Sequence, residues 1–228
     1  MKKYVFLLGA VWLGALALEA QEAPTAGRLG ATRSGPLENT PLLQARVPDG
    51  LWTPQGVGQG FPAHLRECSL SVGAGAVTQD IGGKVPHDLL LTRLDYGVML
   101  GPPVGRDHWY GGNWEFVQEL FGGWQYLPTG RYLTGATSLL RYDFSTGTRW
   151  VPFLDAGIGG SATDIGHPDL GTTGEFNGQI GPGIHYVWSR RTVLTLQYRY
   201  MHTSDGGLGS PNQGINENIV YVGMSWFF

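Results

Sequence analysis

The chain has 228 residues, a formal net charge of −3 and only 14% charged residues, whereas soluble globular chains carry about 25%. The lack of a basic excess argues against nucleic acid as a partner, and no later segment has the long apolar run of a membrane helix. A composition with 37 glycines and 12% aromatic residues, without helical spans, is typical of an outer-membrane barrel.

Residues 1–20 have the features of an export signal. Lys2 and Lys3 precede an apolar run that ends at Leu18, and small residues allow cleavage after Ala20 or Ala17. The run is short for a transmembrane helix. We therefore expect a cleaved signal peptide and export to the bacterial outer membrane, with a retained anchor as the alternative.

Residues 21–65 form a segment of different character. It contains six prolines and seven glycines and shows no sustained hydrophobic period. Such a composition predicts an N-terminal extension in the periplasm that is extended or disordered, and the chain around Leu51 and Trp52 could dock locally.

Residues 66–228 alternate between apolar and polar side chains with period two. In the 192–204 segment, for example, Leu194, Leu196 and Tyr198 alternate with Thr195 and Gln197. Eight such segments predict an all-β fold, an eight-stranded antiparallel transmembrane β-barrel of the outer membrane. They cover residues 66–77, 88–100, 113–124, 131–144, 150–163, 174–189, 192–204 and 215–228.

The last residues fit this fold. Tyr221, Gly223, Trp226 and Phe228 resemble the C-terminal signal by which insertion machinery recognises outer-membrane barrels. We expect Phe228 to make that machinery a partner of the chain.

The interior of an eight-stranded barrel is just filled by side chains, which argues against a pore. The charged residues of the strands fall mainly on the inward face, where we expect a paired polar network. Function is therefore expected on the outer wall, at a mouth or on the loops 78–87, 164–173 and 205–214.

Two polar residues interrupt the lipid-facing side at the end of the seventh segment. His202 and Ser204 continue the outward series of Leu194 and Leu196, and unpaired polar groups are costly in such a place. Residues two apart on one strand face are about 6.5–7 Å apart at Cα, so the side chains could form the Ser–His pair of an activated nucleophile. By itself, however, a His-x-Ser pair often occurs by chance.

The following hairpin could complete a site. If residue 204 pairs with residue 214, Asn216 lies beside His202 and can orient its ring. The amides of Gly206 and Gly207 could then stabilise an oxyanion.

The stretch from His202 to Asn216 resembles the PagL-like lipid A 3-O-deacylase (acyloxyacyl hydrolase) family. It contains a His-x-Ser pair, then Gly-Leu, then Asn-x-Gly; the segments 112–115 and 155–160 also look similar, and the resemblance extends over residues 66–228. It implies an outer-membrane barrel that hydrolyses the 3-position acyl ester of lipid A, the membrane anchor of lipopolysaccharide, with a Ser, a His and a carboxylate on the outer wall.

The chain departs from that family pattern at two positions. Asp205 stands where the family has Asn, which would bring negative charge near an oxyanion. Asn216 stands where the family has its acidic residue, and the alternative acid, Glu217, faces the lumen by parity. Asn can orient a histidine but stabilises an imidazolium less than a carboxylate does, so full, weakened or lost activity all stay open.

Two hypotheses follow from these residues. The first is a lipid A esterase with Ser204, His202 and Asn216 as catalytic residues, supported by Asp205, Gly206 and Gly207. It needs no cofactor, and the scattered histidines do not predict a metal site. The second is a non-catalytic barrel that acts in adhesion or membrane organisation. Neither hypothesis fixes the oligomeric state.

Overall fold

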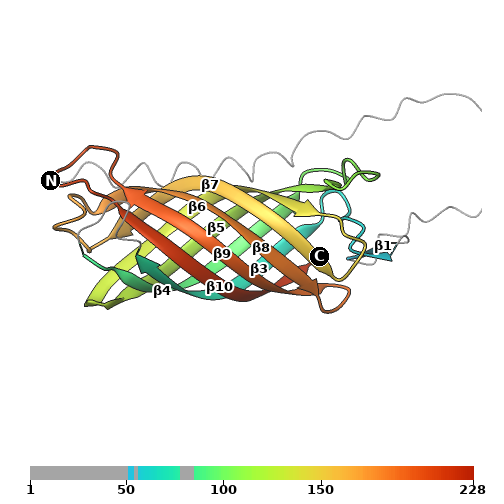
Figure 1. Cartoon of the computed structure of the whole chain (residues 1–228), viewed down its shortest axis with the longest axis horizontal. Helices are drawn as coiled ribbons and strands as arrows, with labels where there is room; N and C mark the ends of the chain where they lie inside the picture. Colours follow the sequence, from blue (N-terminus) through green and yellow to red (C-terminus); the bar gives the residue numbers. More distant parts are fainter. Residues whose placement is uncertain (1–50, 54–55, 78–84) are drawn as a thin grey trace, which may run out of the picture. The chain divides into compact units, whose positions relative to one another are not determined.

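The computed structural model describes residues 51–53, 56–77 and 85–228, so the predicted signal peptide and most of the 21–65 extension lie outside the described residues. Two short strands, β1 (Trp52–Thr53) and β2 (Gly56–Val57), form a small sheet. Eight longer strands form a closed antiparallel barrel, which confirms the predicted fold class (Figure 1). They are β3 (Arg66–Val77), β4 (Asp88–Met99), β5 (Gly112–Leu127), β6 (Thr129–Phe144), β7 (Trp150–Thr163), β8 (Gly174–Val187), β9 (Thr192–Ser204) and β10 (Ile215–Phe227).

Each barrel strand pairs with its neighbour in the chain, and β10 closes the barrel on β3. The described part of the chain contains no helix that is long and apolar enough to cross a membrane.

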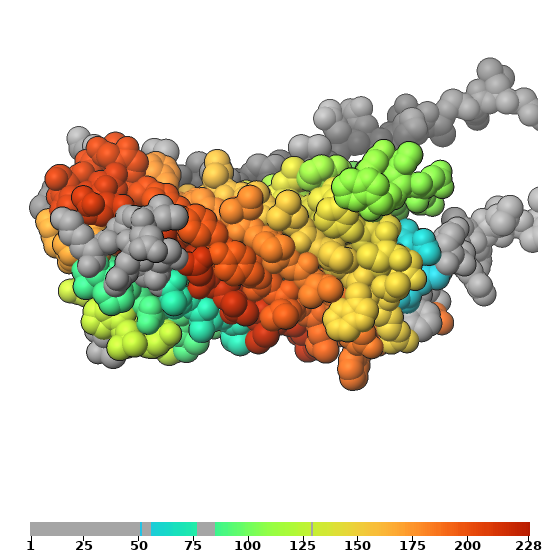
Figure 2. Space-filling view, in the orientation of Figure 1, coloured from blue at the N-terminus to red at the C-terminus, as the bar shows by residue number. Residues whose placement is uncertain are grey.

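Side chains alternate between an apolar outer wall and a buried lumen, as the sequence predicted. In β9, Leu194, Leu196 and Tyr198 are exposed, whereas Gln197 and Arg199 are buried. Figure 2 shows the outer wall over β7 to β10, in yellow to red. Outward apolar residues face lipid in a barrel of this kind.

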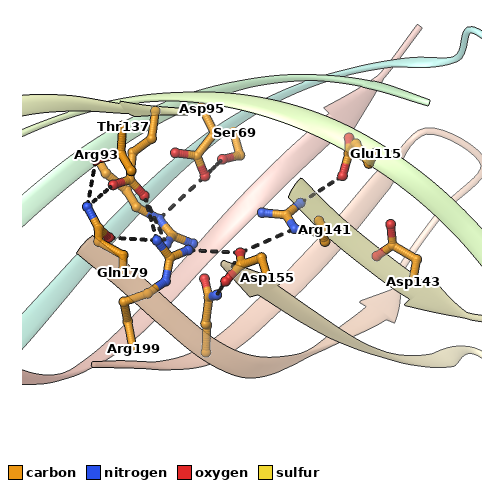
Figure 3. Close-up of polar contacts among 12 residues, drawn as sticks. Ser69, Arg93, Asp95, Glu115, Thr137, Arg141, Asp143, Asp155, Gln179 and Arg199 are labelled. Carbon is orange, nitrogen blue, oxygen red and sulfur yellow. Dashed lines mark hydrogen bonds and ion pairs between the residues drawn. The ribbon is translucent and has the colours of Figure 1, made fainter. Parts of the chain in front are cut away.

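A network of ion pairs fills the middle of the lumen (Figure 3). Arg141 contacts Glu67 at 2.9 Å, Arg199 contacts Asp155 at 2.9 Å, and Arg93 is also buried. Each buried guanidinium has a carboxylate partner, which offsets the cost of removing the charges from water. The expected polar network is therefore present, and these side chains fill the lumen behind the wall that carries the site.

An apolar cluster closes each end of the lumen. At the end where β9 begins, the ring of Phe61 stacks on Phe227 at 5.5 Å, and Leu51 is buried in the same cluster. The chain near Leu51 thus docks locally on the barrel, one of the possibilities that the sequence left open. At the opposite end, called here the upper rim, the cluster includes Met201 and Ile215 beside Ile165 and Leu170. The upper rim also carries the loops 164–173 and 205–214.

Candidate active site on the outer wall

His202 and Ser204 lie on the outer wall at the upper rim, near the end of β9. Strand alternation turns Met201 and Thr203 into the buried interior, so His202 is exposed and Ser204 half-buried on the outside. The two side chains therefore point away from the lumen, as parity predicted.

The imidazole of His202 links two neighbours. Its Nε2 lies 3.0 Å from Ser204 Oγ, and its Nδ1 lies 2.7 Å from Asn216 Oδ1. An amide oxygen can only accept, so Nδ1 carries the proton, and Nε2 has a free lone pair to accept the Ser204 hydroxyl proton. This is the arrangement of nucleophile, base and orienting group that activates a serine.

The β9–β10 register brings Asn216 to this position. Asn216 pairs directly with His202 across the two strands, as the predicted hairpin register requires. Its Oδ1 also accepts a hydrogen bond from the hydroxyl of Tyr200 at 2.6 Å. Two donors therefore converge on one amide oxygen, which fixes the side chain and, through it, the ring of His202.

Gly214 supports the ring of His202 from the side of the loop. Its φ of +74° lies in the left-handed region, where glycine is unstrained. A Cβ at this position would lie 2.8 Å from His202 Cε1. The ring therefore packs directly on the glycine backbone, with no room for a side chain between them.

Asp205 faces inward and does not project over the catalytic pair. It is fully buried, and its Oδ1 accepts a hydrogen bond from the Gly207 amide at 2.8 Å. This contact differs from the expectation that the Gly207 amide faces an oxyanion, because the amide already has a partner. Gly206, on the outside of the same turn, remains the candidate donor of the two.

Glu217 lies on the opposite face of β10 from the candidate site. It is fully buried and pairs with Met201, whereas Asn216 pairs with His202. Within the described residues, neither of its carboxylate oxygens has a hydrogen-bond partner. The geometry therefore gives the orienting position to Asn216 and leaves Glu217, the alternative acid, in the lumen.

The site is open toward β8. There Phe176 pairs with Ser204 and Gly178 pairs with His202. A Cβ at Gly178 would meet nothing within 4 Å, whereas Phe176 is 60% exposed and lies against Gly206. An apolar chain can therefore approach the His202–Ser204 pair along this flank.

Two supporting residues, Tyr200 and Gly214, were not assigned a role from the sequence. The pairing of residues 200 and 218 across the hairpin places Tyr200 on the same face as Asn216. That parity was the one available signal for Tyr200.

A closed barrel with an apolar outer wall and a Ser–His–Asn chain on that wall has the geometry of a membrane-embedded serine hydrolase. The family model for lipid A 3-O-deacylase (PagL) matches residues 92–225, more than half of the chain. The chain therefore belongs to the lipid A 3-O-deacylase (PagL) family.

Curated relatives agree with this assignment. The lipid A deacylase PagL of Bordetella bronchiseptica is 28% identical over 135 residues, which cover 55% of this chain and 71% of the relative. That of Pseudomonas aeruginosa is 30% identical over 95 residues, covering 40% of this chain and 52% of the relative.

Two solved structures show the same fold. The crystal structure of the outer membrane enzyme PagL matches with a TM-score of 0.50 and 20% identity, over 68% of this chain and 97% of that one. Neisserial surface protein A matches with a TM-score of 0.52 and 15% identity, over 72% and 96% of the two chains. Because one is an enzyme and the other a surface protein, the barrel alone does not assign a function.

Proposed function

We propose that the chain is an outer-membrane esterase that removes the acyl chain from the 3-position of lipid A. One observation carries the assignment of the site: within a chain of this family, Ser204, His202 and Asn216 are hydrogen-bonded in series on the outer wall. Lipid A as the substrate follows from the names of the family and of its curated relatives.

Ser204 Oγ attacks the acyl carbonyl carbon while His202 Nε2 takes its proton. The carbonyl oxygen becomes an oxyanion, and the Gly206 amide is the donor proposed to stabilise it. The intermediate then collapses, the sugar oxygen leaves with the proton from His202, and the acyl group remains on Ser204. Water, deprotonated by His202, hydrolyses this ester and releases the fatty acid.

Asn216 has a positioning role in this mechanism. Its Oδ1 holds the Nδ1 proton of His202 and so keeps the Nε2 lone pair directed at Ser204. As a neutral group, it stabilises the imidazolium of the transition state less than a carboxylate would. The Tyr200 hydroxyl on the same oxygen reinforces the position and adds no negative charge.

The proposed location of the site is the outer leaflet. Three of the four connections at the upper rim, 78–87, 164–173 and 205–214, have ten residues each, whereas two of the three at the other end, 145–149 and 188–191, have five and four. Outer-membrane barrels place their longer loops outside the cell. Export by the 1–20 signal and insertion through the Phe228 signal belong to the same proposal. Arg141, Arg199 and their partners fill the lumen. A filled lumen favours an active site on the outer wall over a channel through the barrel.

A test with purified, folded protein in detergent would measure fatty acid released from lipid A by mass spectrometry. We expect the unmodified protein to release one acyl chain, that from the 3-position, and Ser204→Ala to release none. Ser138→Ala is a matched control, since Ser138 is another half-buried serine on the outer wall, and it should be as active as the unmodified protein. Release of no acyl chain by any of the three would favour the non-catalytic barrel.

A further inference from the structure

The loop 164–173 lies beside the loop 205–214 at the upper rim (Figure 2). Ile165 and Leu170 anchor it in the apolar cluster that closes the lumen. A Cβ at Gly171 would lie 2.6 Å from the backbone oxygen of Pro211. The two loops are therefore in close backbone contact.

Asp169 connects three segments of this rim. Its backbone oxygen accepts hydrogen bonds from the amides of Gln213 at 3.0 Å and Gly214 at 3.2 Å. Its Oδ2 lies 2.8 Å from His87 Nε2 and accepts from the Val85 amide at 3.2 Å. Asp169 is thus bonded to the segment before β4 through its side chain and to the segment before β10 through its backbone.

These contacts extend through Gly214 to His202, the candidate general base. Gly214, held by Asp169, is the residue on which the ring of His202 packs. A shift of the Gly214 backbone would change the support of the ring without any direct contact between Asp169 and the reacting atoms.

We propose that Asp169 and His87 are positioning residues of the esterase, a buried pair that holds Gly214 against His202. The inference rests on the proposed function. Asp169 is fully buried and His87 is 4% exposed, so Asp169→Ala would leave the buried Nε2 of His87 without its Asp169 partner, which is expensive. The two residues lie outside the β9–β10 hairpin that forms the site.

The first test compares kinetic constants on lipid A. We expect Asp169→Ala and His87→Ala each to lower kcat about tenfold, since small misplacements of a catalytic group are costly, with KM within about twofold because substrate contacts stay in place. Asp169→Asn keeps an oxygen acceptor for His87 and Val85 and should restore most of the loss. The double variant should be no worse than either single variant, because the pair acts as a unit.

A second measurement does not depend on activity. With ¹³C-labelled histidine, the NMR signal of His202 Cε1–Hε1 should move in Asp169→Ala, and the Gly214 amide should exchange faster with deuterium. Asp164→Ala is a matched control in the loop 164–173, because Asp164 forms hydrogen bonds with Tyr132 and Arg131 and not with the loop 205–214. It should leave the His202 signal in place.

The outcomes separate the two proposals. If no protein deacylates lipid A while Asp169→Ala still moves the His202 signal, the positioning role holds and the esterase assignment fails. If the unmodified protein is active and Asp169→Ala matches it in kcat, or if the His202 signal stays in place, the positioning role is overturned.

Discussion

Gly214→Ala is expected to reduce catalysis while leaving the barrel folded. The added Cβ would lie 2.8 Å from His202 Cε1 and 3.3 Å from the backbone oxygen of Thr203. An ordinary contact is at least 3.4 Å, so the ring must move by about 0.6 Å. A movement of that size along the His202–Ser204 direction would lengthen their 3.0 Å hydrogen bond to about 3.6 Å, beyond hydrogen-bonding range.

The expected loss is about 10- to 100-fold in kcat, since a misplacement of about 1 Å can cost a hundredfold. Initial rates of fatty acid release from lipid A would measure it, with heat-modifiable mobility on gels to check folding. Gly130→Ala is the matched control, because Gly130 also has a positive φ but a Cβ there would meet nothing within 4 Å. If Gly214→Ala retains full kcat, the packing of His202 on Gly214 has no part in catalysis.

Three further predictions concern the neighbours of His202. Asn216→Asp places a carboxylate oxygen where Oδ1 now lies 2.7 Å from His202, so kcat should rise about tenfold or more in the same assay; a fall would contradict the role given to Asn216. Tyr200→Phe removes the donor to Asn216 and should lower kcat several-fold, about the worth of one hydrogen bond, whereas an unchanged kcat would show that Asn216 needs no second donor. Gly178→Trp should cover the open flank and lower kcat/KM by about tenfold or more, and Ala136→Trp, elsewhere on the outer wall, should not; equal effects of the two would place the substrate on another side.

Strand positions were largely predictable because period two is strict in this chain. β9 and β3 begin and end at the predicted residues. The β5–β6 hairpin is longer than predicted, with strands that reach Leu127 and Thr129. The pairing of the two strands continues through an irregularity between Gln125 and Tyr126, so only Pro128 separates them.

The central residues of the candidate site were also predictable from the sequence. Parity alone placed His202 and Ser204 on the outer wall, and the hairpin register placed Asn216 beside His202. The same parity turns Asp205 inward, so its carboxylate binds the turn rather than facing the outer surface.

The contacts that support the site were not predictable in the same way. Asp169 reaches Gly214 and His87 across long stretches of chain, and no local period encodes a contact between two loops. The packing of His202 on Gly214 depends on a positive φ and on a side-chain rotamer. Such features are decided by tertiary structure.

The central claim is that Ser204 and His202 remove an acyl chain from lipid A. Mass spectrometry of lipid A from cells that express the protein tests it most directly. With the unmodified protein, lipid A should lose the mass of one fatty acid, and with Ser204→Ala or His202→Ala inserted in the membrane at equal level it should keep that acyl chain. Loss of the chain with Ser204→Ala as complete as with the unmodified protein would contradict the account.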